Sequence, residues 1–324
     1  MNDTATSIAI AVLIPCYNEE VAVSHVVAGF RAALPTATVH VFDNNSSDRT
    51  AEVARAAGAL VHRVVAQGKG HVVRRMFADI EADIYVLVDG DDTYDPASAA
   101  AMIDTLLRER LDMVVGTRVS DQKSAYRAGH RFGNALLTRM VSVIFGRAFS
   151  DILSGYRVFS RRFVKSFPAI SGGFEIETEL TVHALQLIMP CGELETPYGS
   201  RREGSLSKLS TYRDGLRILL TILQLLRLEM PLRFFSAVAT LFALASILFG
   251  IPLILDYIET GLVPRLPTAV LSTGLMLMAA LALASGFILD NVTRGRRELR
   301  HLFYLRNAGP PTDRRKLERR NEAS

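Results

Sequence analysis

The segment IYVLVDGDD, residues 84–92, decides the fold, because five apolar residues lead directly into Asp89, Gly90 and Asp91. A short apolar run bounded by polar residues is typical of a buried strand. Similar runs occur at residues 8–14, 38–42, 60–64 and 113–115. Amphipathic segments with helical spacing separate them, at residues 20–32, 48–57, 69–82 and 97–110. The alternation predicts an α/β fold, in which helices cover both faces of a mostly parallel sheet.

The polar residues at the strand ends are the candidate functional residues, because open parallel sheets bind ligands beyond the carboxyl ends of their strands. Asp89 and Asp91 lie one residue apart, so both carboxylates can reach one Mg²⁺ or Mn²⁺ ion together with a nucleotide diphosphate. Such a cation neutralises charge on a departing diphosphate. A bare D-x-D also occurs in solvated turns, but its place after the fourth strand favours a metal site.

Two other strand ends offer contacts for a nucleotide. Asp43 can accept hydrogen bonds from a base or ribose, although the following Asn44, Asn45 and Ser46 also suit an Asx-turn or a helix cap. Lys69 opens a helix, where its ammonium group and the free backbone N–H groups can bind phosphate. Neither a Walker loop nor a G-x-G-x-x-G fingerprint is present, which argues against a dinucleotide-dependent oxidoreductase.

The composition changes beyond residue 210. Residues 212–230 carry leucines at helical spacing with arginines between them, which is typical of an amphipathic helix in a membrane interface or of a core-facing soluble helix. Residues 232–258 are almost wholly apolar, and residues 268–289 contain no charge. Each segment exceeds the ~20 residues that span a hydrocarbon core. The sequence therefore predicts two transmembrane helices.

Arginines flank both predicted spans, so the positive-inside rule places both flanks in the cytoplasm. We expect a multi-pass protein of the inner (plasma) membrane. Its predicted parts are a cytoplasmic catalytic domain at residues 1–210, an interfacial helix at 211–230, a two-helix hairpin at 231–290 and a basic cytoplasmic tail at 291–324. Residues 1–7 lack a basic n-region, so no cleavable signal peptide is expected. The two cysteines, Cys16 and Cys191, are far apart in the sequence, so no disulfide framework is expected.

The ordered motifs resemble inverting GT-A glycosyltransferases, in particular dolichyl-phosphate mannosyltransferases and bacterial polyprenyl-phosphate glycosyltransferases. They are VLIPCYNEE at residues 12–20, FDNNSSD at 42–48, GKG at 68–70 and DGD at 89–91. The resemblance covers residues 8 to about 215. It implies metal-dependent transfer of a hexose, with inversion, from a nucleotide-diphosphate sugar to undecaprenyl or dolichyl phosphate, a step of cell envelope biogenesis.

The resemblance also implies which residues bind the donor. Pro15, Tyr17, Glu19 and Asp43 are expected to hold the nucleoside, and Asp89 and Asp91 the metal ion and the diphosphate. Lys69 and Gly90 complete this candidate set. Two positions depart from the family pattern. The frequent Asp-Asp-Gly-Ser is Asp43-Asn44-Asn45-Ser46 here, which leaves a UDP or a GDP donor open. The glutamine of D-x-D-L-Q is Thr93, which leaves the third metal ligand open.

The acceptor side resembles the same family. DILSGYR at residues 151–157 matches its D-x-x-S-G-[FY]-R element, and RREGSLSK at 201–208 matches its basic acceptor loop. The resemblance implies phosphate contacts from Arg118, Arg131, Arg202 and Lys208. Guanidinium groups suit this role because each can fork onto two phosphate oxygens.

Asp91 and Asp151 are the candidate catalytic residues. A phosphate monoester has its second pKa near ~6, so it is already nucleophilic at neutral pH and needs little help from a base. Asp151 is the candidate base or orienting group, and the alternative is that it holds Arg157 or the metal shell. Farther along the chain, Glu175 and Glu179 are expected on one face of a helix.

Other classes of protein fit the sequence less well. A nucleotidyltransferase would carry a glycine-rich loop with arginine after the first strand, and a processive polysaccharide synthase would carry Q-x-x-R-W, whereas this chain has no tryptophan. A membrane scaffold explains the spans but not the polar strand ends. A membrane-anchored glycosyltransferase with another lipid or glycan acceptor remains an alternative. No nucleic-acid partner is expected, and the small residues of segment 279–286 permit a homo-oligomer.

Overall fold

The structure is a computed structural model of the 324-residue chain. It describes residues 8–119, 139, 141, 149–169, 173, 175–199, 220, 224 and 226–311. The chain forms two compact units. The first comprises Met1–Gly215 together with Arg300–Ser324, and the second comprises Leu216–Leu299.

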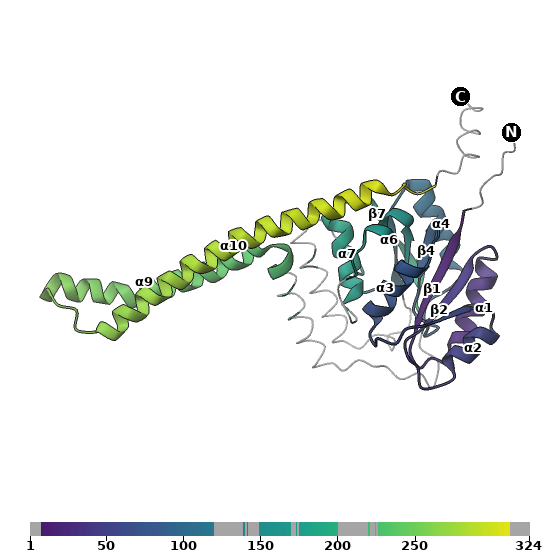
Figure 1. Cartoon of the computed structure of the whole chain (residues 1–324), viewed down its shortest axis with the longest axis horizontal. Helices are drawn as coiled ribbons and strands as arrows, with labels where there is room; N and C mark the ends of the chain where they lie inside the picture. Colours follow the sequence, from purple (N-terminus) through teal and green to yellow (C-terminus); the bar gives the residue numbers. More distant parts are fainter. Residues whose placement is uncertain are drawn as a thin grey trace, which may run out of the picture. The chain divides into compact units, whose positions relative to one another are not determined.

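A seven-stranded sheet lies at the centre of the first unit (Figure 1). Its strands are β1 (Ile10–Cys16), β2 (Thr38–Asp43), β3 (Leu60–Arg63), β4 (Ile84–Leu87), β5 (Met113–Val119), β6 (Arg157–Ser160) and β7 (Cys191–Pro197). Their order is β3-β2-β1-β4-β6-β5-β7, and β6 runs antiparallel to its neighbours β4 and β5. The five apolar runs predicted to be strands are β1 to β5, so the predicted α/β fold with a mostly parallel sheet is confirmed.

Helices cover both faces of this sheet, as the unbroken apolar strands predict. They are α1 (Val23–Ala33), α2 (Thr50–Ala56), α3 (Lys69–Asp79), α4 (Ser98–Glu109), α6 (Arg161–Ser166) and α7 (Ile176–Gln186). On one face, Val12 of β1 belongs to the same buried cluster as Phe30 of α1 and Met102 of α4. On the other face, Phe77 of α3 packs edge-on against the ring of Tyr85 in β4. Residues that alternate along a strand thus fill two cores.

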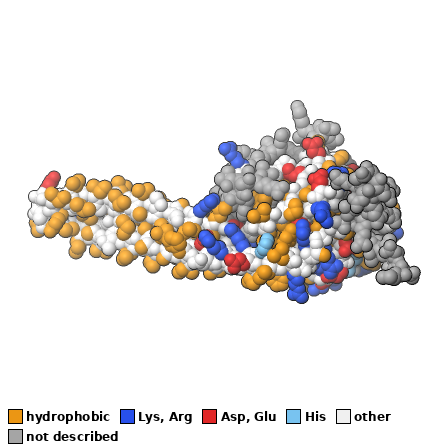
Figure 2. All heavy atoms as spheres, turned by 90° about the horizontal axis from the view of Figure 1, so that it is seen from above, with side chains coloured by type: hydrophobic (Ala, Val, Ile, Leu, Met, Phe, Trp, Pro, Cys, Tyr) orange, Lys and Arg blue, Asp and Glu red, His pale blue; other side chains and the backbone are white. Residues whose placement is uncertain are grey.

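The second unit contains α9 (Pro231–Thr260) and most of α10 (Leu266–Arg306). Both helices are long and apolar enough to cross a membrane, with mean hydropathies of 2.5 and 1.9 over their most apolar windows. Only 17% and 11% of those windows are buried, whereas the core helix of a soluble protein would be mostly buried. Apolar side chains cover the surface of these helices that faces the viewer in Figure 2.

Polar and small residues join α9 to α10. The hydroxyl of Ser246 donates to the carbonyl of Ser272 at 2.8 Å, and the hydroxyl of Ser272 donates back to the carbonyl of Ser246 at 2.9 Å. Gly286 is buried against α9, where an added Cβ would lie 3.0 Å from Cβ of Phe235. Such contacts are typical of helix pairs in an apolar solvent.

The structure adds one feature to the predicted membrane region, because α10 continues beyond residue 289 to Arg306. Its last two turns belong to the first unit, where Tyr304 donates a 2.8 Å hydrogen bond to the buried carboxylate of Asp112. Most of the predicted interfacial helix at 211–230, and the tail beyond residue 311, lie outside the described residues.

Candidate active site

The parallel pairing of β1 with β2 and β4 brings three polar strand ends to one edge of the sheet. Cys16 is opposite Asp43 in the β1–β2 register, and Leu13 is opposite Leu87 in the β1–β4 register. The segment after β1, the end of β2 and the acid pair after β4 therefore lie near one another. An added Cβ on Gly90 would lie 2.5 Å from Sγ of Cys16, so glycine permits this close approach of the acid pair to β1.

The two carboxylates of the acid pair have different surroundings. Asp91 is buried, and its Oδ1 accepts a 2.6 Å hydrogen bond from the hydroxyl of Thr93. The side chain of Asp89 is 29% exposed, and its Oδ1 accepts a 2.5 Å hydrogen bond from Nζ of Lys69. Thr93, which takes the place of the family's glutamine, thus orients Asp91.

Gly155 of the DILSGYR segment lies against Asp89 of the acid pair. An added Cβ on Gly155 would collide with the carboxylate of Asp89, so only glycine fits there with the carboxylate in this position. The amide of Gly155 donates to the hydroxyl of Tyr94 at 2.9 Å, which fixes the loop. The loop that resembles an acceptor element therefore lies directly against Asp89, one of the two candidate metal ligands.

The residues at this edge fit a divalent cation that is shared with a ligand. In the part of the chain that the structure describes, no group of three or more His, Cys, Asp or Glu side chains could hold a metal ion. Asp89 and Asp91 offer hard oxygen ligands, and the ammonium of Lys69 already places a positive charge against Asp89. Water molecules, or the oxygens of a diphosphate once it binds, would complete the coordination shell.

Lys69 occupies the first position of α3 and lies between two carboxylates. Its Nζ is 2.5 Å from Oδ1 of Asp89 and 2.5 Å from Oε1 of Glu177 in α7. Burial lowers the pKa of Lys69, but the attraction of Asp89 and Glu177 outweighs burial and raises the pKa above its usual value. Burial raises the pKa of Glu177, which the contact with Lys69 partly offsets. Lys69 is therefore charged at neutral pH.

The side chain of Asn44 holds the segment that precedes Lys69. Its Oδ1 accepts a 2.8 Å hydrogen bond from the amide of Gly68, and its Nδ2 donates to the carbonyl of Ala66 at 2.8 Å. Gly68 has φ +129°, a conformation that favours glycine. The asparagine that departs from the family pattern therefore positions the turn that carries Lys69.

The candidate nucleoside-binding residues follow β1 and β2. Asp43 is buried, and its Oδ1 accepts a long, 3.4 Å hydrogen bond from the amide of Ser46. This local contact spans three residues, one more than the contact of an Asx-turn. Pro15, Tyr17 and Glu19 are partly buried. The amide of Glu19 donates to the hydroxyl of Thr50 at 2.8 Å, which ties the segment after β1 to α2.

On the acceptor side, Arg118 forms a bidentate pair with Asp151. Its Nε is 2.7 Å from Oδ2 of Asp151, and its terminal nitrogen is 2.8 Å from Oδ1. Arg118 also lies over the ring of Tyr198, 5.5 Å from the centroid. Both oxygens of Asp151 are engaged by one guanidinium, which is the geometry of an orienting group. Arg131, Arg202 and Lys208 lie outside the described residues.

Arg157, the first residue of β6, holds the preceding DILSGYR loop in place. It is fully buried and donates to the carbonyls of Ser154 and Ile152, at 3.0 and 2.6 Å, and to the hydroxyl of Thr181 at 2.9 Å. These bonds shape the loop and attach it to α7. The sequence alone does not identify Glu177, Asn44 or Gly155 as site residues, because their contacts are with partners distant in the chain.

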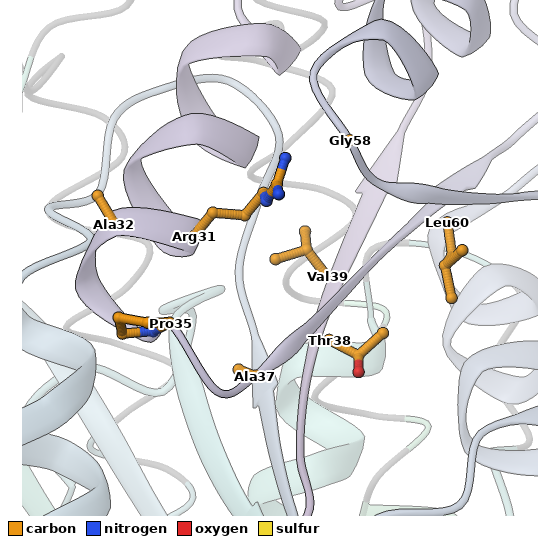
Figure 3. Close-up of a pocket in the computed structure, with 8 residues that line it drawn as sticks. All are labelled: Arg31, Ala32, Pro35, Ala37, Thr38, Val39, Gly58 and Leu60. Atoms are coloured by element: carbon orange, nitrogen blue, oxygen red, sulfur yellow. The ribbon is translucent and has the colours of Figure 1, made fainter.

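A separate hollow of about 650 Å³ lies at the other edge of the sheet (Figure 3). Its lining residues are Arg31, Ala32, Pro35, Ala37, Thr38, Val39, Gly58 and Leu60. They lie at the amino ends of β2 and β3, far from the carboxyl ends where parallel sheets bind ligands. We assign no function to this hollow.

The mostly parallel sheet with polar residues at its strand ends has the GT-A fold of glycosyltransferases, and comparisons with known proteins agree. Glycosyl transferase family 2 matches residues 11–167. Glycosyltransferase AglJ of Haloferax volcanii is 36% identical over 251 residues, which are 77% of this chain and 82% of that protein. Protein RfbJ of Shigella flexneri is 58% identical over 123 residues, 38% of this chain and 95% of that protein. The chain belongs to glycosyl transferase family 2 and is a glycosyltransferase.

More distant relatives and solved structures extend the comparison. A dolichyl-phosphate hexose transferase of Haloferax volcanii is 27% identical over 209 residues, 64% of this chain and 90% of that protein. The crystal structure of glucosyl-3-phosphoglycerate synthase from Mycobacterium tuberculosis, in complex with Mn²⁺, UDP and glucosyl-3-phosphoglycerate, has a TM-score of 0.54 at 22% identity. The match covers 67% of this chain and 80% of the synthase chain, and it shows that the two share the GT-A fold.

Proposed function

We propose that the protein transfers a hexose from a nucleotide-diphosphate sugar to a polyprenyl phosphate, with inversion, at the cytoplasmic membrane surface. The observation that carries this proposal is the convergence of Asp89, Asp91 and Lys69 with the DILSGYR loop at one sheet edge. A relative named for dolichyl-phosphate hexose transfer supports the lipid-phosphate acceptor. The two apolar helices would keep the enzyme beside such a lipid.

On the donor side, Pro15, Tyr17, Glu19 and Asp43 would hold the nucleoside at the ends of β1 and β2. A divalent cation, Mg²⁺ or Mn²⁺, bound by Asp89 and Asp91 would supply neutralisation of charge on the leaving diphosphate. Lys69 would donate to the diphosphate, while Gly90 lets the loop approach the donor closely. Thr93 and Gly155 position the two carboxylates.

On the acceptor side, Arg118, Arg131, Arg202 and Lys208 would bind the lipid phosphate. A phosphate monoester is largely dianionic at neutral pH, since its second pKa is near ~6. The enzyme would therefore work by positioning the acceptor oxygen behind the anomeric carbon rather than by removing a proton. Attack from that face inverts the anomeric centre. Asp151, through its bidentate pair, would aim Arg118 at the phosphate.

The membrane arrangement belongs to the same proposal. Helices α9 and α10 would cross the bilayer as a hairpin, with the catalytic unit and the C-terminal tail in the cytoplasm. A reporter fused after Ser324 should be active only in the cytoplasm. Detection of that reporter outside the cell would contradict the orientation.

Incubating membranes that contain the protein with radiolabelled nucleotide sugars, and then extracting the lipids, tests the proposed reaction. The panel should include UDP- and GDP-linked hexoses, with Mg²⁺ or Mn²⁺. Label should enter the lipid fraction with one donor and disappear in the Asp91→Asn variant. Label that enters only glycans, or lipids without phosphate, would instead support the alternative acceptor classes.

A further inference from the structure

Glu177 is a buried carboxylate to which the proposed reaction gives no role. It lies in the first turn of α7, is 6% exposed, and has its Oε1 2.5 Å from Nζ of Lys69. Its Oε2 has no hydrogen-bond partner among the residues that the structure describes. A buried carboxylate is costly unless it is paired and hydrogen-bonded. The question is why Lys69 has two carboxylate partners when Asp89 alone would neutralise it.

The charges of Lys69, Asp89 and Glu177 give a reason for the second carboxylate. One ammonium between two carboxylates leaves one negative charge over, so the cluster can accept further positive charge. A divalent cation that binds Asp89 would repel the ammonium of Lys69 from that carboxylate, because like charges interact strongly in a poorly solvated site. Glu177, which lies 2.5 Å from Nζ of Lys69 and belongs to a different element from Asp89, would then remain as the partner of Lys69.

We propose that Glu177 is a positioning residue, which holds Lys69 when Asp89 takes up the divalent cation and so keeps the ammonium aimed at the donor diphosphate. The inference rests on the proposed binding of a cation by Asp89 and Asp91. An ammonium has three donors and no fixed direction, so two carboxylates can share it and one can retain it. Without Glu177, Lys69 would stay on Asp89 and compete with the cation.

Titrating the full-length protein with Mn²⁺ alone, and measuring free Mn²⁺ by electron paramagnetic resonance, tests the inference. Glu177→Gln keeps the shape of the side chain but removes its charge, and it should weaken Mn²⁺ binding about tenfold, which corresponds to about 1.4 kcal/mol. Adding Lys69→Gln to Glu177→Gln should restore the affinity, because the competing ammonium is gone. Glu175→Gln, a loss of one carboxylate at the start of the same helix, should leave Mn²⁺ binding unchanged.

A structural role would give a different pattern. If Glu177 had only a structural role, Glu177→Gln would lower the melting temperature. Any change in Mn²⁺ affinity would then not depend on the presence of Lys69. An unchanged Mn²⁺ affinity in Glu177→Gln, or no recovery in the double variant, would therefore overturn the inference. If Glu177→Gln does not fold, Lys69→Gln alone decides. It should bind Mn²⁺ more tightly than the wild type, and weaker binding would overturn the inference.

The wild type and Asp91→Asn separate this inference from the proposed function. Mn²⁺ binding by the wild type, loss of it in Asp91→Asn and no effect of Glu177→Gln would leave the metal site standing and overturn only the role of Glu177. Absence of Mn²⁺ binding by the wild type would overturn both.

Discussion

Carboxylates hold two cations of the candidate active site in different ways. On the donor side, the ammonium of Lys69 is shared between Asp89 and Glu177 at 2.5 Å each. On the acceptor side, the guanidinium of Arg118 is forked onto the single carboxylate of Asp151. An ammonium is a point charge that can move between partners, whereas a planar guanidinium fixes a direction. Under the proposed function, the donor side would therefore redistribute charge, whereas the acceptor side would keep one orientation.

The largest expected effect comes from removing a carboxylate on the donor side. Asp91→Asn should lower kcat about 100-fold or more, since stabilisation of developing charge is often the largest catalytic contribution. The change keeps the size of a residue in the loop that follows β4, so the melting temperature should stay near that of the wild type. Rates and melting curves with Mg²⁺ and Mn²⁺ check both expectations.

Asp92→Asn is the matched control for this prediction. Asp92 has φ +60°, a conformation that asparagine adopts readily, and it lies outside the proposed metal pair. Its variant should retain most activity. Equal losses in the two variants would mean that the acid pair is wrongly assigned.

The second effect in size tests whether the two sides depend on one another through Gly155. Gly155→Ala would place a Cβ against the carboxylate of Asp89 and displace it, so activity should fall about 10- to 100-fold, as misplaced catalytic groups commonly show. Gly199→Ala is the control, because its Cβ would have only ordinary contact, 3.8 Å from the carbonyl of Thr93. Steady-state rates of both variants decide, and near-normal activity of Gly155→Ala would refute the packing argument.

On the proposed acceptor side, the bidentate pair of Arg118 and Asp151 predicts a loss of acceptor affinity without a loss of donor affinity. Arg118→Ala should raise the apparent KM for the acceptor phosphate, because it removes a charge-assisted contact that contributes about 1.5–3 kcal/mol. Arg118→Lys should recover little, because an ammonium cannot fork onto two oxygens. Donor binding should change little in both variants. Arg202→Ala and Lys208→Ala should also weaken acceptor use, measured with a soluble short-chain phosphate in detergent. An unchanged KM in all four variants would exclude these phosphate contacts.

The smallest effect concerns the orientation of one carboxylate. Thr93→Val removes the 2.6 Å hydrogen bond to Asp91 while keeping the side-chain volume. A net hydrogen bond contributes about 0.5–1.5 kcal/mol, so the Mn²⁺ concentration for half-maximal activity should rise only several-fold. Thr93→Ser, which keeps the hydroxyl, should restore the wild-type value. A loss as large as that in Asp91→Asn would mean that Thr93 itself ligates the metal ion.

The sequence predicts the first half of the fold well, because its strands are unbroken apolar runs and its polar residues follow them directly. It does not predict β6, since this four-residue strand begins with Arg157, a charge that is usually exposed. The structure buries Arg157 by satisfying its donors with Ser154, Ile152 and Thr181. Those partners lie in a loop and a helix that become neighbours only in the folded chain.

Glu177 shows the same limit at the site. Helical spacing places Glu175 and Glu179 on one face, and both are partly exposed, while the buried carboxylate between them pairs with Lys69 of α3. No local pattern predicts a contact between residues so far apart in sequence. The acid pair, in contrast, follows its own strand, so the sequence alone identifies it as a candidate site.

Lipid-phosphate specificity is the central claim, and purified protein tests it most directly. The protein in detergent should receive its nucleotide-sugar donor, a divalent cation, and either a short-chain prenyl phosphate or the corresponding prenol without phosphate. The account predicts a prenyl-phosphate hexose of inverted anomeric configuration, identified by mass spectrometry and by nuclear magnetic resonance, and no product from the prenol. Glycosylation of the prenol at a comparable rate, or a retained configuration, would contradict it.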